Sequence, residues 1–421
     1  MRRRREDPGE ERQGVGPVIP PLSDSQRPLR QQIFERIRAA GAVSRVQLAR
    51  DLLVSPASVT TLTSELIGAG LVEEISRGSE GGRGRPAVAL GVRAEACRVA
   101  GMKLSDREHT AVIVDFAGNL VADDAIPGSA APVATAELLD ALERLLDRVC
   151  AKAGIGRGDL AALGLGAPGF VDAATGVVHW SSALRARDVP LAAAAAERFG
   201  LPVTIDNDAN LVTLAELWFG AGRRLSDFAV VTIEHGVGMG YVLNHRIYRG
   251  GRGVGMELGH TKVQLDGALC RCGQRGCLEA YVADYALARE ATTALNLPLH
   301  ASPPDGALLD ALFHQAKAGD AAAQSIFRRA GRYLAVGLSN VINIFDPGLI
   351  ILSGGRMRFD YLYAEETLAE MAHLAIVTGR PPTPVEIHAW GDLLWAHGAA
   401  ALALSEVSER LLAAPREIAA Q

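Results

Sequence analysis

One histidine and three cysteines stand close together in the second half of the chain. His260 precedes Cys270, Cys272 and Cys277, while the other two of the five cysteines lie far upstream. One imidazole and three thiolates are the ligands of a closed tetrahedral zinc site. Clustering of this kind favours metal binding over a disulfide framework. The sequence therefore predicts one structural Zn²⁺. The alternative is a chance group of reduced cysteines.

Three motifs around and before this cluster carry a resemblance to a known family. Met256–His260, followed by Cys-x-Cys-Gly-x-x-Gly-Cys-Leu-Glu ending at Glu279, is similar to the signature of the ROK family, named for repressors, open reading frames and kinases. Ile205–Asn210 resembles the catalytic-loop motif of that family, and Gly166–Gly169 resembles its sugar-side turn. The likeness runs from Pro28 to the C-terminus. It implies an α/β protein: an N-terminal winged helix-turn-helix followed by a two-lobed actin-like, sugar-kinase-like (ribonuclease H-like) ATPase fold.

The resemblance also implies a sugar site. The side chains that match its sugar-binding positions are Asn207, Asp208, Glu257, His260 and Glu279. Carboxylates and an amide suit this role because a pyranose presents a ring of hydroxyl donors and acceptors. His260 can bind zinc through one ring nitrogen and the sugar through the other, so that the metal fixes its tautomer. The alternative for both glutamates is a solvated loop carboxylate.

Some residues of the site favour phosphorylation of the sugar, and others argue against it. Asp208 matches the general base of the family's kinases, but the motifs that bind phosphate differ. The kinases begin with an Asp-x-Gly-Gly-Thr turn, whose backbone N–H groups cradle phosphate. Here Lys103–Arg107 replaces it, with a carboxylate at Asp106 and no glycine. The second loop, Gly-Thr-Gly-x-Gly in the kinases, reads Glu234–Gly238, and a carboxylate repels a nucleotide. No catalytic residue is expected, and Asp208 is interpreted as a vestigial base.

The leading hypothesis is a sugar-responsive, DNA-binding transcriptional regulator whose degenerate kinase cleft serves as the ligand sensor. A repressor of carbohydrate uptake or catabolism genes fits it best. The first alternative is an ATP-dependent sugar kinase with a fused DNA-binding domain. The second is a regulator that responds to a protein partner. Leu184–Pro190 lacks the aromatic residue that winged-helix relatives often carry there, which leaves the sugar open.

The N-terminal region supplies the expected DNA contacts. Ser55 and Pro56 form an N-cap followed by proline at the first helical position, a typical helix start. Small hydroxyl side chains on this helix are predicted to reach base edges: Ser58, Thr60, Thr61 and Ser64. Arg83 and Arg85 lie in a glycine-rich turn and are predicted to enter a minor groove. Residues 1–90 carry 14 arginines against 11 acidic residues, which suits a polyanionic partner. The alternative is a winged helix that contacts only proteins.

Composition and periodicity divide the chain into four parts. They are a disordered basic tail (1–25), the winged helix-turn-helix (26–92), a first lobe (93–224) and a second lobe with the zinc loop (225–421). Within the first lobe, Val112–Asp115 is predicted to be a strand and Ala136–Ala153 an amphipathic helix. A helix over 391–412 is expected to return to the first lobe.

The remaining expectations concern location and partners. No apolar run reaches about 18 residues, and acidic residues follow Arg2–Arg5 where a signal peptide would be apolar. A cytoplasmic protein with no membrane partner is therefore expected. Its predicted partners are a double-stranded DNA operator and a small-molecule sugar or sugar derivative. A homodimer or homotetramer is expected, because half-sites in operators mirror protein two-fold symmetry.

Overall fold

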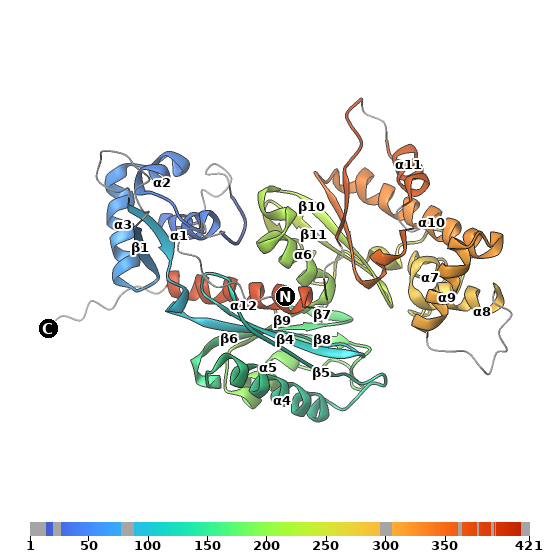
Figure 1. Ribbon diagram of the computed structural model, residues 1–421, viewed down its shortest axis with the longest axis horizontal. Helices are drawn as coiled ribbons and strands as arrows, with labels where there is room; N and C mark the ends of the chain where they lie inside the picture. The colour runs from blue at the N-terminus through green and yellow to red at the C-terminus, as the bar shows by residue number, and fades with distance from the viewer. Residues whose placement is uncertain are drawn as a thin grey trace. The chain divides into compact units, whose positions relative to one another are not determined.

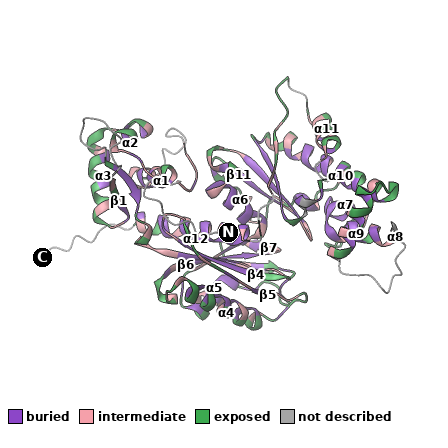
Figure 2. Ribbon diagram, in the orientation of Figure 1, coloured by how far each residue is buried: buried purple, intermediate pink, exposed green. Residues whose placement is uncertain are grey.

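The computed structural model describes residues 14–19, 27–76, 88–294, 305–360, 364–376, 379–388, 391 and 393–413. The chain forms two compact units. The first comprises residues 1–226 together with 393–421, and the second comprises residues 227–392. Figure 1 labels their helices and strands, and Figure 2 shows that buried residues line the sheets and the inner faces of the helices. Among the described residues, no helix has the length and apolar character needed to span a bilayer.

The N-terminal part of the first unit has three helices followed by a two-stranded antiparallel sheet. The elements are α1 (Leu29–Ala40), α2 (Arg45–Leu52), α3 (Pro56–Gly68), β1 (Val72–Ser76) and β2 (Val88–Val92). Ser44 caps α2 by accepting the N–H of Gln47, and Ser55 caps α3 by accepting the N–H of Ser58, both at 3.1 Å. These caps satisfy backbone donors that a helix start leaves unpaired. The helices fit a DNA-binding domain, as the sequence predicts.

A short segment before α1 is ordered against the rest of the unit. Val15 donates its backbone N–H to the carbonyl of Arg38 at 3.0 Å, and Gly16 donates to Trp218 at 2.8 Å. Val18 donates to Arg223 at 2.7 Å. The prediction of disorder over residues 1–25 is therefore wrong for residues 14–19, because backbone hydrogen bonds to distant residues order a segment that has no apolar periodicity. The other predicted tail residues lie outside the described part of the chain.

The first lobe is a five-stranded sheet in the order β5-β4-β3-β6-β9. Its strands are β3 (Arg98–Lys103), β4 (Glu108–Asp115), β5 (Leu120–Pro127), β6 (Leu160–Ala167) and β9 (Val203–Asn207). β3, β6 and β9 run parallel, while β4 and β5 are antiparallel to their neighbours. A second hairpin pairs β7 (Phe170–Asp172) with β8 (Val177–Trp180).

Helices cover both faces of this sheet (Figure 1). They are α4 (Thr135–Ala153), α5 (Leu191–Phe199), α6 (Asp208–Phe219) and α12 (Leu394–Ala413). α12 lies so close to the sheet that a Cβ on Gly101 would stand 2.1 Å from the Ala396 carbonyl oxygen. A Cβ on Gly398 of α12 would stand 1.9 Å from the Leu211 oxygen of α6. Glycine is therefore required at both positions for the C-terminal helix to pack against the first lobe.

The second unit repeats this strand arrangement, with the order β12-β11-β10-β13-β14. Its strands are β10 (Phe228–Ile233), β11 (Val237–Leu243), β12 (Arg246–Ile247), β13 (Ile350–Ser353) and β14 (Val385–His388). Its helices are α7 (Glu279–Val282), α8 (Asp284–Ala294), α9 (Asp305–Lys317), α10 (Ala321–Phe345) and α11 (Glu365–Leu374). β10, β13 and β14 run parallel, and β11 and β12 complete an antiparallel edge. Two lobes of the same topology give the mixed α/β fold that the sequence predicts.

Candidate functional site

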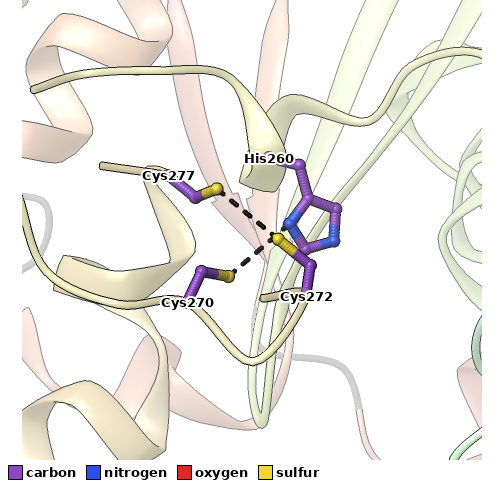
Figure 3. A group of neighbouring side chains, drawn as sticks. All are labelled: His260, Cys270, Cys272 and Cys277. Atoms are coloured by element: carbon purple, nitrogen blue, oxygen red, sulfur yellow. Dashed lines mark hydrogen bonds between the residues drawn. The ribbon is translucent and has the colours of Figure 1, made fainter. Parts of the chain in front are cut away.

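The four predicted metal ligands lie together in the second lobe (Figure 3). The ligand atoms of His260, Cys270, Cys272 and Cys277 all lie within 4.8 Å of one another. The Nδ1 atom of His260 is 3.7 Å from the Cys270 sulfur, and the Cys272 and Cys277 sulfurs are 3.7 Å apart. Around a tetrahedral Zn²⁺ with ordinary bond lengths, the ligand atoms lie about 3.6–3.8 Å from one another. The cluster can therefore hold a metal ion, and its donor set and spacing fit zinc.

Two glycines allow the cysteine loop to fold back on itself. Gly273 has φ +87° and Gly276 has φ +76°, both in the left-handed region that side chains disfavour. A Cβ on Gly276 would stand 1.6 Å from the carbonyl oxygen of Gln264. β-bridges join Lys262 to Cys277 and Leu269 to Arg275 across the fold. The loop therefore brings its three sulfurs together through backbone geometry that only glycine permits.

Charge around the cluster also suits a bound cation and its thiolates. Burial raises the pKa of the Cys270 thiol to about 12, so its ionisation requires a cation beside it. The Lys262 ammonium lies 3.0 Å from the Cys277 sulfur and 3.2 Å from the His260 carbonyl oxygen. Three thiolates around a divalent ion leave one net negative charge, which the lysine offsets. Lys262 was not predicted; its place beside the ligands emerges only when the loop folds.

Glu279 connects the cysteine loop to the turn between β10 and β11. Its carboxylate is buried, with one oxygen 3.5 Å from the Cys270 sulfur and 3.4 Å from the Tyr285 hydroxyl. The other oxygen accepts the backbone N–H of Val237 at 3.3 Å. A Cβ on Gly236 would stand 2.8 Å from the same carboxylate. The carboxylate is therefore positioned by groups from three segments of the second lobe.

Glu257 precedes the one-turn helix η5 (Leu258–His260) and is exposed. Met256 before it has φ +68°, a strained conformation for a residue with a side chain. The backbone N–H of His260 donates to the Glu257 carbonyl at 3.0 Å. Because the Nδ1 atom of His260 faces the cysteines, its Nε2 atom lies on the other side of the ring. Glu257, His260 and Glu279 thus belong to one connected part of the second lobe.

In the first lobe, Asn207 and Asp208 stand where β9 ends and α6 begins. The Asn207 side chain donates to the Gly169 carbonyl at 2.6 Å and accepts the N–H of Ala209 at 2.8 Å, which caps α6. The two motifs matched in this lobe, Gly166–Gly169 and the Asn207 loop, are therefore in direct contact. Asp206 was not predicted as part of the site. It is fully buried and accepts from the Asn207 N–H and the Asn210 amide, both at 2.8 Å.

The loop that aligns with the first phosphate motif uses its backbone donors internally. It connects β3 to β4, and the Ser105 N–H donates to the Nδ1 atom of His109 at 3.2 Å. The Arg107 N–H donates to the Ser105 hydroxyl at 3.3 Å, and that hydroxyl donates to Asp106 at 3.2 Å. Side chains of the protein therefore accept two of the N–H groups of this loop, Ser105 and Arg107, of the kind that a phosphate-binding turn offers to a nucleotide.

The loop that aligns with the second phosphate motif supplies a carboxylate to a backbone donor of another glycine turn. Glu234 follows β10, and its side chain accepts the N–H of Gly355 at 2.9 Å. Gly355 belongs to the glycine turn after β13, in which Gly354 has φ +109°. Backbone N–H groups in such a turn form an anion-binding concavity. Here the Glu234 carboxylate, rather than a bound phosphate, accepts the Gly355 N–H.

The predicted DNA-reading residues occupy α3. Thr60, Thr61 and Ser64 are exposed, whereas Ser58 is half-buried and its hydroxyl lies 2.8 Å from that of Ser55. Arg50 is exposed at the end of α2 and was not predicted as a contact. In helix-turn-helix proteins the helix before the recognition helix crosses the DNA backbone, which could have drawn attention to Arg50. The predicted wing contacts Arg83 and Arg85 lie outside the described residues.

The family model described as "ROK family" matches residues 100–406. The chain belongs to the ROK family. Among curated relatives, the DNA-binding transcriptional dual regulator NagC of Escherichia coli (strain K12) is 29% identical over 325 residues, covering 76% of this chain and 79% of the relative. The putative xylose repressor of Caldicellulosiruptor sp. (strain Rt8B.4) is 28% identical over 385 residues, 89% of this chain and 95% of the relative.

The chain is similar to solved structures of both a regulator and a kinase of the family. A ROK family transcriptional regulator, described as a homolog of the Escherichia coli MLC protein, has a TM-score of 0.75 at 25% identity and covers 91% of this chain and 97% of its own. The ROK hexokinase from Thermus thermophilus has a TM-score of 0.62 at 31% identity and covers 74% of this chain and 99% of its own. The predicted family, fold class and regulator class are therefore confirmed. Sugar kinases of the family match as well.

Proposed function

We propose that the chain is a sugar-responsive transcriptional regulator in which a kinase-derived site senses the sugar without phosphorylating it. The single observation that carries this proposal is the hydrogen bond from the Gly355 N–H to the Glu234 carboxylate. A nucleotide phosphate would have to displace that carboxylate and approach its negative charge. At about 5 Å this repulsion is about 1–3 kcal/mol for effective dielectric constants between those of water and a protein surface. Asp208 is then a vestigial base.

The sugar-binding side chains are Asn207 and Asp208 in the first lobe and Glu257, His260 and Glu279 in the second. Support comes from the ordered loops that hold them. Asn207 is fixed by Gly169 and by the start of α6, and Glu279 is fixed by Val237 and Tyr285. Fixed carboxylates and amides lose little entropy when they bind hydroxyl groups.

His260, Cys270, Cys272 and Cys277 would hold a structural Zn²⁺, which supplies a cross-link between the His260 turn and the cysteine loop. His260 would face the metal with its Nδ1 atom and offer its Nε2 atom to a sugar hydroxyl. Lys262 would offset the charge of the thiolates. The predicted ligand role and the predicted sugar role of His260 are therefore compatible.

DNA binding would occur as a homodimer or homotetramer through α3 and the wing. Thr60, Thr61 and Ser64 are exposed on α3, with Ser58 at its N-terminal end. The Thr60 hydroxyl donates to the Pro56 carbonyl at 2.9 Å and offers its oxygen as an acceptor to a base edge. Arg83 and Arg85 would supply affinity for the phosphate backbone and the minor groove. The small hydroxyl side chains would make contacts that depend on the DNA base sequence, and the arginines would make the DNA affinity depend on salt concentration.

A panel of sugars tests the proposal. N-acetylglucosamine, xylose and glucose would each be titrated into the full-length protein by calorimetry and in a thermal-shift assay. A cognate sugar at 100 times its Kd stabilises the native state by about 2.7 kcal/mol. The Glu257→Ala variant should lose this response, whereas Glu365→Ala, an exposed site at the start of α11, should keep it. A Glu257→Ala variant with wild-type sugar affinity would contradict the proposed site.

The second candidate function is a sugar kinase, favoured by the retained Asp208. A coupled ATP assay with magnesium on the same three sugars separates the two. Turnover that Asp208→Asn abolishes would establish the kinase and overturn the sensor.

A further inference from the structure

A buried arginine links the winged helix to the first lobe. Arg38 of α1 is 5% exposed, and its guanidinium lies 4.3 Å from the centroid of the Trp218 ring. It also lies 5.4 Å from the Phe34 ring and donates to the Ser408 hydroxyl of α12 at 2.8 Å. Burial lowers the pKa of Arg38 to about 10, so the group is still a cation at neutral pH. A buried cation on an aromatic face is sensitive to the position of that ring.

The segment 14–19 closes over this contact. Gly16 donates its N–H to the Trp218 carbonyl, and Val15 donates to the carbonyl of Arg38 itself. Gly16 has φ +86°, and a Cβ there would stand 3.4 Å from the Arg38 Nε atom. Arg223 completes the contact: it donates to the Ala39 carbonyl at 2.8 Å and to the Gly16 carbonyl at 3.0 Å. The end of α1 and the end of α6 are therefore fastened by the same short segment.

The other end of α6 is the sugar-side loop. Asn207 caps the helix and Asp208 is its first residue, whereas Trp218 is its second-to-last. A helix of 12 residues is about 18 Å long and moves as a rigid rod. α6 is buried along most of its length and touches α12 at Gly398, so displacement at one end is transmitted to the other. One helix thus joins a proposed sugar contact to the winged helix.

We propose that α6 carries sugar occupancy to the DNA-binding domain, and that Arg38, Trp218 and the segment 14–19 form the joint through which it acts. This inference rests on the proposed function, because it requires a sugar at Asn207 and Asp208. A sugar that shifts the start of α6 would move Trp218 beneath Arg38 and turn α1 relative to the first lobe. Changing the joint should then remove the response to sugar without removing sugar binding.

The test uses full-length protein and a labelled DNA duplex selected from a random pool by the wild-type protein. Sugar affinity would be measured by calorimetry, and DNA affinity by anisotropy with and without whichever of N-acetylglucosamine, xylose and glucose binds. In wild type the two DNA Kd values should differ by about 5–150-fold, the usual range of allosteric coupling. In Arg38→Met this ratio should fall to within about twofold of 1, with sugar affinity changed by less than about threefold. Loss of winged-helix stability alone would weaken both DNA affinities and leave their ratio unchanged.

Matched controls lie on the same elements. Arg36→Met changes an arginine of α1 that pairs with Asp51 inside the winged helix, and it should keep the wild-type ratio. If Arg38→Met does not fold, Arg223→Met replaces it, with the exposed neighbour Arg224→Met as its control. A wild-type ratio in the folded variant of the joint overturns the inference and leaves the proposed function standing. A wild-type protein that binds none of the three sugars overturns both.

Discussion

The loss of stability caused by removing the Glu279 side chain can be estimated from its contacts. Glu279→Ala removes the acceptor of the Val237 N–H and one of the two acceptors of the Tyr285 hydroxyl, which keeps the Cys270 sulfur at 3.5 Å. Burial raises the pKa of Tyr285, so its hydroxyl stays protonated and needs an acceptor. A buried donor without an acceptor costs about 1–3 kcal/mol, and the long bond of 3.3 Å places the Val237 N–H near the lower end. The Tyr285 hydroxyl loses its 3.4 Å bond to the carboxylate but keeps the sulfur, which costs less. With the lost packing of the buried side chain, the variant should be less stable by about 2 kcal/mol.

Scanning calorimetry measures this loss on the second lobe. For a unit of this size it corresponds to a fall in Tm of about 4–8 °C. Glu279→Gln is the matched control, because its amide oxygen can still accept one bond while its charge is gone. The glutamine variant should melt within about 3 °C of wild type and bind sugar about tenfold more weakly, as expected when one charged hydrogen bond becomes neutral. An alanine variant with the wild-type Tm would refute the argument for the buried carboxylate. A glutamine variant with wild-type sugar affinity would refute the sugar contact.

Three further predictions follow from the metal cluster, the phosphate loops and the wing. Metal analysis of protein prepared without chelator should find about one zinc per chain, and Cys272→Ser should lose it; metal-free wild-type protein would disprove the site. Wild-type protein should show no sugar-dependent ATP turnover. Glu234→Gly should strengthen ATP binding by about 5–150-fold, which is equivalent to the removal of about 1–3 kcal/mol of repulsion. Equal ATP affinity in the wild-type and variant proteins would contradict the role given to Glu234. Changing Arg83 and Arg85 together to Ala should reduce the slope of the logarithm of the DNA association constant against the logarithm of salt concentration by about 2. Thr61→Ala should instead change sequence preference more than affinity for bulk DNA. An unchanged slope in the double variant would exclude the wing as a DNA contact.

Local signals explain most of what the sequence predicted. Ser55 is the helix cap that the sequence predicts, because a cap depends on residues only three apart. The strand predicted at Val112–Asp115 lies within β4, and the helix predicted at Ala136–Ala153 begins one residue earlier, at Thr135. The cysteine loop is predictable because its ligands and glycines lie within a short segment. In each case the residues that decide the structure are close in sequence.

Contacts between distant residues explain what the sequence did not predict. Glu234 and Gly355 are 121 positions apart, so the sequence suggests repulsion of a nucleotide but not the bond that holds the carboxylate in the turn. The order of residues 14–19 depends on carbonyls of Arg38 and Trp218. Long-range pairing of this kind leaves no periodic pattern in the chain.

The central claim is that one protein binds both a sugar and DNA, and that the first controls the second. Its most direct test is the affinity of the full-length protein for its selected DNA duplex, measured by anisotropy at fixed salt with and without the cognate sugar. Wild type should show about a 5–150-fold difference, and Glu257→Ala should bind the sugar-free duplex with nearly wild-type affinity but show no response. Equal affinities in wild type at saturating sugar, or a full response in Glu257→Ala, would contradict the account.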